Sequence, residues 1–181
     1  MRASKRDRII TGALELAHRD GFDSLTFDTL AEHVGLSRGG VIYHFRTKTE
    51  LLEGIAAAFL ERWRTQALAA LGGPLEEASR TERIEALTRS VLDGEILPGE
   101  VSFMLSATPE AEMLKEAWNT LRREWVGEIR ELTAMQRVAL LAVDGWWANR
   151  AVDTDSQDPD DPETAELIVS LARGEHARGQ Q

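Results

Sequence analysis

Apolar residues recur at helical spacing along most of the chain, and the segments beyond the first fifty residues show no clear two-residue alternation. The pattern predicts an all-α fold of about nine helices. The expected helices run from about Ser4 to Asp20, Phe27 to Val34, Ser37 to Phe45, Thr47 to Leu71, Thr81 to Asp93, around Phe103 to Leu105, Leu114 to Leu132, Thr133 to Val152, and from Asp161 or Pro162 onward.

Two short helices joined by a tight turn are predicted between Thr26 and Phe45. Thr26 is a suitable N-cap for the first helix, and Gly35 supplies the backbone freedom that ends it. Ser37 can cap the second helix. The inward-facing stripe of the first helix is Phe27, Leu30, Ala31 and Val34. This arrangement is the helix-turn-helix, a motif that reads DNA.

Two adjacent glycines, Gly39 and Gly40, lie within the second helix. Each glycine costs a helix roughly 1 kcal/mol relative to alanine, so a compensating role is expected. One interpretation is close approach of the backbone to another molecule. The other is tight packing of this helix against the helices before it.

The next helix opens with a capping pattern, Thr47 followed three residues later by Glu50. A helix N-terminus beside Lys48 favours an anion, and a DNA phosphate is the expected one. An ordinary capped surface helix is the alternative.

Residues from about 6 to 52 resemble the DNA-binding domain of the TetR family of transcriptional repressors. The resemblance lies in the opening amphipathic helix with its Gly21–Phe22 turn, the block from Thr26 to Val34, and the run GLSRGGVIYHFRTKTELL. It implies that Tyr43, His44, Thr47 and Lys48 meet phosphates, and that Ser37, Arg38 and Gly40 approach the groove. Many relatives carry a base-contacting side chain where this chain has the glycine pair, so direct readout is expected to depend on Arg38 and Ser37. The full set of expected DNA-binding residues is Thr26, Ser37, Arg38, Gly39, Gly40, Tyr43, His44, Thr47 and Lys48.

The charge is divided unevenly along the chain, whose net charge is −10. Residues 1–50 hold eight basic and seven acidic residues, a net of +1, and the other 131 residues hold thirteen and twenty-four, a net of −11. An acidic body repels DNA outside a small contact patch, which lowers nonspecific affinity. The basic residues at the start, Arg2, Lys5, Arg6 and Arg8, are expected to form a solvated terminus or, alternatively, an arm that reaches the DNA.

Several classes of protein are disfavoured by what the sequence lacks. It contains no cysteine, no secretory signal pattern, no apolar run of about 20 residues and no metal-ligand spacing among its four histidines. We therefore expect a cytoplasmic protein with no membrane, no metal and no cofactor. The acidic segment 153–163 lacks the glycine and terminal glutamate of an EF-hand loop, so it is interpreted as a linker. No enzymatic motif is present.

The sequence is expected to divide into a DNA-binding domain, residues 1–50, and a helical effector-binding and dimerisation domain, residues 51–181. Residues 133–152 are apolar on nearly every side of a helix, and such a helix must be covered all round. In the TetR family the last two helices pair with their twofold mates. Residues 133–152 and the helix that starts at Asp161 or Pro162 suit that role. Burial inside a monomer is the alternative. A homodimer is expected, since a helix-turn-helix reader uses two half-sites roughly 34 Å apart.

Five tryptophans in a small acidic chain suggest an effector pocket. The resemblance implies a small-molecule site in the helices after the DNA-binding unit, and nearby acids such as Glu124, Glu128 and Asp144 suit an aromatic or cationic ligand. The alternative is that these aromatic residues are ordinary core and interface. The candidate wall residues are Trp63, Phe103, Met104, Trp118, Leu121, Trp125, Trp146 and Trp147.

The sequence thus predicts a ligand-responsive DNA-binding regulator, most simply a repressor that a small molecule releases from a palindromic operator, with activation as a variant. An all-α ligand carrier or enzyme without DNA binding is the alternative.

Overall fold

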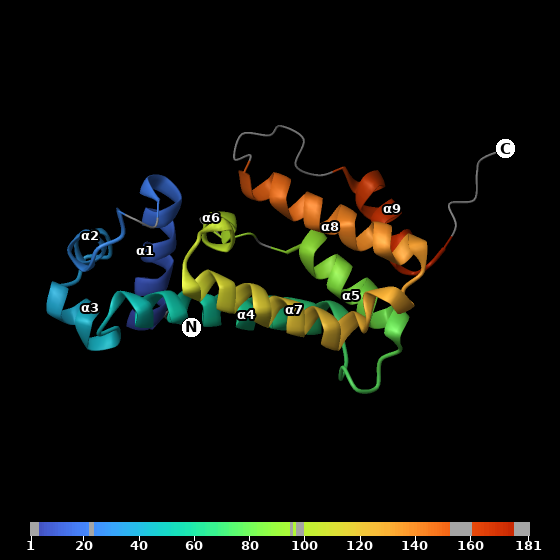
Figure 1. Cartoon of the computed structure of the whole chain (residues 1–181), viewed down its shortest axis with the longest axis horizontal. Helices are drawn as coiled ribbons and strands as arrows, with labels where there is room; N and C mark the ends of the chain where they lie inside the picture. Colours follow the sequence, from blue (N-terminus) through green and yellow to red (C-terminus); the bar gives the residue numbers. More distant parts are fainter. Residues whose placement is uncertain (1–3, 22–23, 95, 97–99, 153–160, 176–181) are drawn as a thin grey trace. The chain divides into compact units, whose positions relative to one another are not determined.

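The chain forms nine α-helices and no strand within the part that a computed structural model describes, residues 4–21, 24–94, 96, 100–152 and 161–175. Figure 1 shows them in order along the chain. The helices are α1 (Lys5–Asp20), α2 (Phe27–His33), α3 (Arg38–His44), α4 (Lys48–Leu71), α5 (Arg80–Leu92), α6 (Glu100–Leu105), α7 (Pro109–Val126), α8 (Ala134–Val152) and α9 (Pro162–Ala172). The predicted all-α class is confirmed.

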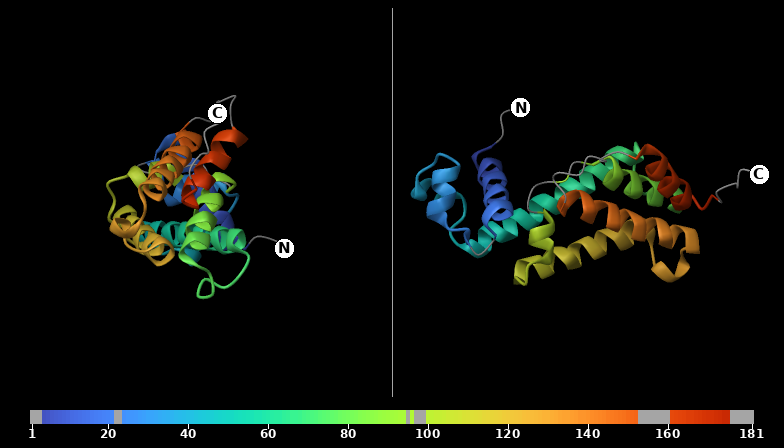
Figure 2. Two further views of the ribbon diagram at one scale, coloured as in Figure 1. Left: turned by 90° about the vertical axis from the view of Figure 1, so that its right-hand side faces the viewer. Right: turned by 90° about the horizontal axis from the view of Figure 1, so that it is seen from above.

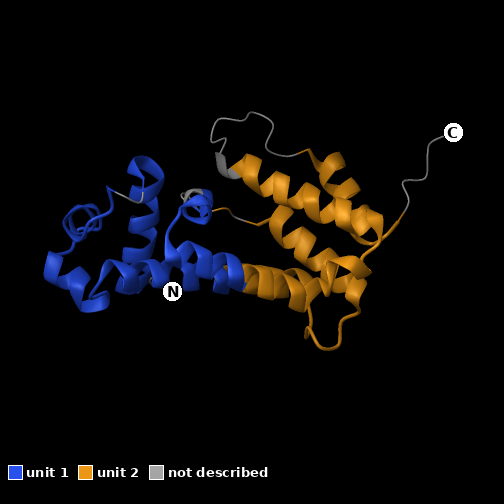
Figure 3. Ribbon diagram, viewed as in Figure 1, with its two compact units in different colours: residues 1–61, 97–117 blue, residues 62–96, 118–181 orange. Residues whose placement is uncertain are grey.

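The chain divides into two compact units, coloured in Figure 3, and the boundaries lie within α4 and α7. Unit 1 comprises Met1–Glu61 and Leu97–Ala117, and unit 2 comprises Arg62–Ile96 and Trp118–Gln181. The division proposed from the sequence, at residue 50, marks the end of the reading motif and stays a prediction. Most of the acidic segment 153–163 lies outside the described residues.

Unit 1 is organised around α1, which packs against α2 and α6. Ser4 caps α1 through a reciprocal pair of hydrogen bonds with Asp7. One face of α1 is buried, at Ile10, Ala13, Leu14 and Ala17, which repeat at helical spacing.

In unit 2, helices α5, α8 and α9 pack pairwise against one another. Figure 2 shows α8 and α9 side by side. Two arginines tie the three helices together through polar groups. Arg150 at the end of α8 donates to the carbonyl oxygen of Leu92, at 2.9 Å. Arg173, just after α9, donates to both carboxylate oxygens of Glu85 on α5, at 2.9 and 2.7 Å.

Helix α7 ends earlier than the apolar period predicts. It stops at Val126, and Gly127 follows with a φ of 75°, its N–H bonded to the carbonyl of Arg123. A short 3-10 helix, Ile129–Glu131, precedes Leu132. Leu132 is buried as predicted but does not belong to this helix.

Helix α8 is not covered on every side by the described part of its own chain. Val138 is 51% exposed and Leu141 is 70% exposed, and Leu167 on α9 is 47% exposed. Among the described helices none combines the length and apolar character needed to cross a membrane.

Candidate nucleic-acid interface

The helix-turn-helix is built by local capping bonds, as its sequence predicts. Thr26 Oγ1 accepts a hydrogen bond from the backbone N–H of Thr29 at 3.1 Å, and Thr29 Oγ1 accepts from that of Thr26 at the same distance. Gly35 ends the turn with a φ of 62°, and Ser37 caps α3 by accepting from the N–H of Gly40 at 3.0 Å. The side chains of Thr26 and Ser37 therefore hold the motif in shape.

Two arginines predicted as terminus or arm are used inside unit 1. Arg8 donates through Nη2 to the carbonyl oxygens of Val34 and Gly35, which satisfies carbonyls at the end of α2. Arg6 lies over the ring of Phe45, 5.0 Å from its centroid. These contacts fix α1 to the turn between α2 and α3 and to the residue that follows α3. Arg6 and Arg8 are thus exposed to solvent, as one of the two expectations has it, but each also makes a contact within unit 1.

The outer face of α3 presents polar groups to solvent. Tyr43 is 83% exposed, and its ring meets that of His44 edge-on at 5.2 Å. Arg38 is exposed, and its Nε lies 3.2 Å from Oδ1 of Asp28 in the first turn of α2. The exposed guanidinium and phenol groups of this face are suited to a polar, charged surface such as DNA.

The two adjacent glycines differ in what surrounds them. A Cβ added at Gly39 would meet nothing within 4 Å, whereas one added at Gly40 would lie 3.2 Å from Ser37 Oγ. Tight packing against the preceding helices therefore does not explain Gly39. The other interpretation, close approach of the backbone to another molecule, stays a prediction for that position.

The start of α4 follows α3 directly and is capped as predicted. Thr47 Oγ1 accepts from the N–H of Glu50 at 3.0 Å, and the Glu50 carboxylate accepts from the N–H of Arg46 at 2.7 Å. Thr47 and Lys48 are exposed beside this N-terminus. The expected DNA-binding residues thus gather on α3 and the adjoining ends of α2 and α4, and their contact with DNA stays a prediction.

The predicted ligand residues occupy different surroundings. Trp63 and Trp118 form an edge-to-face pair in unit 2, with ring centroids 4.9 Å apart. Leu121 and Trp125 are buried in unit 2 with 1% exposure each. Trp146 and Trp147 are half-buried, and Nε1 of Trp146 has no hydrogen-bond partner among the described residues.

The other two ligand candidates belong to unit 1. Phe103 is fully buried and meets Phe59 edge-on at 5.9 Å, which is the packing of a core residue. Met104 is half-buried. The structure therefore does not place all the candidates in one unit.

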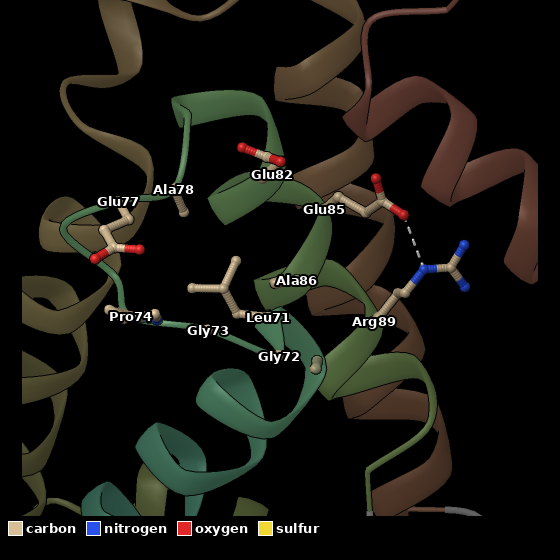
Figure 4. Close-up of a pocket in the computed structure, with 11 residues that line it drawn as sticks. Leu71, Gly72, Gly73, Pro74, Glu77, Ala78, Glu82, Glu85, Ala86 and Arg89 are labelled. Atoms are coloured by element: carbon tan, nitrogen blue, oxygen red, sulfur yellow. Dashed lines mark hydrogen bonds and ion pairs between the residues drawn. The ribbon is translucent and has the colours of Figure 1, made fainter.

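Two pockets lie elsewhere in the described part of the chain. One, of about 400 Å³, lies in unit 2 between the end of α4 and α5. Figure 4 shows its acidic side chains, Glu77, Glu82 and Glu85, with Leu71 between the loop and α5. The other, of about 200 Å³, is an apolar groove of unit 1 between α4 and α7. None of the predicted tryptophans lines either pocket. No group of three or more His, Asp or Glu in the described ranges is placed to hold a metal ion.

Sequence reasoning did not identify the ion pair between Asp28, in the first turn of α2, and Arg38. Asp28 and Arg38 are ten positions apart, on different helices, so no helical spacing signals their pairing. The same holds for Arg8 and the carbonyl of Val34. Residue type shows which groups are able to pair, but it does not show which of them do.

Comparison with known proteins places this interface in a family. Residues 9–55 match the family model for bacterial regulatory proteins of the tetR family. The chain is 40% identical over 53 residues to the HTH-type transcriptional regulator SrpR of Pseudomonas putida, which covers 29% of this chain and 25% of that protein. It is 27% identical over 171 residues to the tetracycline repressor protein class G of Vibrio anguillarum, covering 90% of this chain and 77% of the relative.

Solved structures agree over nearly the whole chain. AibR in complex with isovaleryl coenzyme A and operator DNA is 17% identical, with a TM-score of 0.62 over 93% of this chain and 97% of that one. The multidrug binding protein EbrR complexed with malachite green is 20% identical, with a TM-score of 0.60 over 93% and 98%. At this identity the likeness concerns the fold. Residues 9–55 therefore form the N-terminal segment typical of the tetR family of bacterial regulatory proteins, and the likeness over the rest of the chain is one of fold.

Proposed function

We propose that this protein is a ligand-responsive transcriptional regulator that represses from a palindromic DNA operator and is released by a small molecule. The observation that carries the proposal is the helix-turn-helix of α2 and α3, whose outer face is polar and exposed, within the segment that matches the family. The match to SrpR spans a quarter of that relative's length. The activity of the whole chain is therefore our inference and is not taken over from SrpR.

In the proposed complex α3 enters the major groove. Ser37, Arg38 and the backbone at Gly39 and Gly40 face the bases there. Contacts to phosphates position the protein without reading sequence. The residues proposed for that role are Thr26 at the start of α2, Tyr43 and His44 at the end of α3, and Thr47 and Lys48 at the start of α4.

A homodimer is part of the proposal. Val138, Leu141 and Leu167 leave apolar surface exposed on the two helices that lie side by side in unit 2. Apolar surface of this kind is stabilised when a partner covers it. A second copy is the partner that a palindromic operator requires, because two reading heads must engage two half-sites.

We propose residues 51–181 as the effector-binding and dimerisation domain, with a flat aromatic effector in unit 2. The edge-to-face pair of Trp63 and Trp118 and the unpaired Nε1 of Trp146 support an aromatic ligand that offers a hydrogen-bond acceptor. A cationic ligand is less well supported. Glu124 already lies 3.7 Å from Arg64, and Asp144 lies 3.0 Å from Arg122. Structural relatives solved with malachite green and with isovaleryl coenzyme A illustrate the range of ligands that such folds hold.

Release by the effector follows from linkage. If the ligand binds better to a conformation whose reading heads are badly spaced, it weakens DNA binding by the same coupling free energy with which DNA weakens ligand binding. Enzymatic chemistry has no part in this mechanism.

The test is selection of bound DNA from a random pool, followed by a gel-shift titration of the selected site at several salt concentrations. A regulator yields a palindrome that binds saturably, tighter than scrambled DNA, with affinity that falls steeply as salt rises. Binding that is salt-sensitive but indifferent to sequence contradicts the proposal. No DNA binding at all favours a ligand carrier. Compounds are then screened for release of the selected DNA, with tryptophan fluorescence as a second readout.

A further inference from the structure

We propose that Asp28 is a positioning residue that directs Arg38 to a guanine in each operator half-site. The inference rests on the proposed function, since it concerns how the same interface chooses its DNA. It starts from one contact, the 3.2 Å ion pair between Arg38 Nε and Asp28 Oδ1.

The atom that Arg38 uses in this pair determines what it can still do. A guanidinium carries five N–H donors in a rigid planar fork. When Nε faces a carboxylate, the opposite edge, formed by the two terminal nitrogens, can donate two parallel hydrogen bonds. Guanine presents two neighbouring acceptors, O6 and N7, in the major groove, and a bidentate arginine is the commonest specific contact to them. When Asp28 holds Arg38 in this way, the two terminal nitrogens of Arg38 are left to donate to O6 and N7 of a guanine.

The neighbours of Arg38 leave the fork room to reach a base. Gly39 and Gly40 follow it on α3, and a Cβ added at Gly39 would meet nothing within 4 Å. Two glycines place no side chain between the guanidinium and the groove. The glycines also leave few other side chains on α3 that could contact a base. The orientation of Arg38 therefore determines more of the sequence specificity.

Stability of the fold does not account for the pair. Arg38 and Asp28 are 60% and 75% exposed, and an ion pair so exposed contributes little to folding. A carboxylate so close to DNA also lowers the attraction of the motif for phosphates. Its presence on the reading face is explained if it restricts Arg38 to one orientation, which lowers the conformational entropy lost on binding.

The experiment uses the full-length protein and the operator selected as above. Each guanine in a half-site is replaced in turn by 7-deazaguanine, which lacks the N7 acceptor, and affinity is measured by fluorescence anisotropy. The variants are Asp28→Asn, which keeps the shape and removes the charge, and Arg38→Lys, which keeps the charge and removes the fork. Glu32→Gln is the matched control, because Glu32 is an exposed acid on the same helix. Thermal unfolding confirms that each variant is folded.

For the wild type, replacing one symmetric pair of guanines with 7-deazaguanine should lower the affinity for DNA about fivefold or more. Arg38→Lys should abolish that sensitivity, Asp28→Asn should reduce it, and Glu32→Gln should retain it. If Asp28→Asn and Glu32→Gln raise affinity for all DNA equally and keep the wild-type sensitivity, Asp28 is only a negative charge and the inference fails. It also fails if no guanine depends on Arg38. A wild type that selects no DNA defeats the proposed function itself.

Discussion

Adding one methyl group at two glycines of unit 1 should change stability in opposite directions. Gly54 is buried in α4, and a Cβ there would lie 2.6 Å from Cε1 of Phe45 and 3.1 Å from Nη2 of Arg6. Gly39 is exposed in α3, and a Cβ there would meet nothing within 4 Å. The Phe45 ring is covered by Arg6 and only 2% of the residue is exposed, so it has little room to move.

The magnitudes follow from overpacking and helix propensity. Ordinary contact needs about 3.4 Å, so Gly54→Ala must displace the Phe45 ring by about 0.8 Å. Overpacking of this kind costs about 1–3 kcal/mol, and replacing glycine in a helix returns up to about 1 kcal/mol. Gly54→Ala should therefore lose about 1 kcal/mol net, whereas Gly39→Ala should gain up to about 1 kcal/mol. At about 2–4 °C per kcal/mol, the two melting temperatures should differ by roughly 2–8 °C.

The assay is thermal unfolding followed by circular dichroism, with urea titration of the same samples to give the free energy of unfolding. Both proteins are compared with wild type at one concentration, because a dimer's melting temperature depends on concentration. If Gly54→Ala is as stable as Gly39→Ala, the close contact of Gly54 with Phe45 does not govern packing at this joint and the reasoning is refuted.

Further outcomes are expected at the interfaces and in unit 2. Gly39→Ala should weaken operator binding although it stabilises the fold, and unchanged affinity by anisotropy contradicts close approach at that position. Lys48→Ala should weaken binding to all DNA sequences alike and reduce the salt slope by about 1; a change in sequence preference instead counts against a phosphate contact. Leu141→Glu should shift the protein from dimer to monomer in sedimentation, while a dimer of unchanged affinity removes that residue from the interface. Arg173 holds the pKa of the Glu85 carboxyl below its usual 4.5. Since a depressed carboxyl pKa stabilises the fold above that value and loses this effect as pH falls, the difference in unfolding free energy between wild type and Glu85→Gln should narrow from about pH 7 to about pH 3.

The helices could be predicted because their signals are local. The 3.6-residue period and the predicted caps at Thr26 and Ser37 all lie within one or two turns of the elements they define. The same locality explains the error at Leu132. It stands seven residues after Trp125, so it keeps the helical period, although the chain turns at Gly127 between them. The spacing of apolar residues indicates which residues are buried. It does not show that the helix ends between them at one residue with positive φ.

The pairings within the site could not be predicted, because they depend on how helices meet. Arg8 looks like part of a free basic terminus until α1 lies beside the end of α2, where its guanidinium reaches two carbonyls. Phe103 is an aromatic residue of the kind that lines pockets, but in the structure it is a core residue packed on Phe59. In both cases the contact depends on tertiary structure, which residue type and spacing do not report.

These pairings bear on how strongly one reading head, residues 1–50, attracts DNA phosphates. Of the eight basic residues in positions 1–50, Arg8, Arg19 and Arg38 already contact oxygen atoms of the chain, and the net charge of that segment is only +1. Long-range attraction to phosphate is therefore weak, and one head alone should hold DNA poorly. Two linked heads gain about 10²–10⁴ in affinity when both half-sites are engaged, and lose that gain when their spacing is wrong. A weakly basic head is thus better suited to release than a strongly basic one, because an effector has only to disturb spacing. A head that bound DNA tightly by itself would remain bound whatever the effector did.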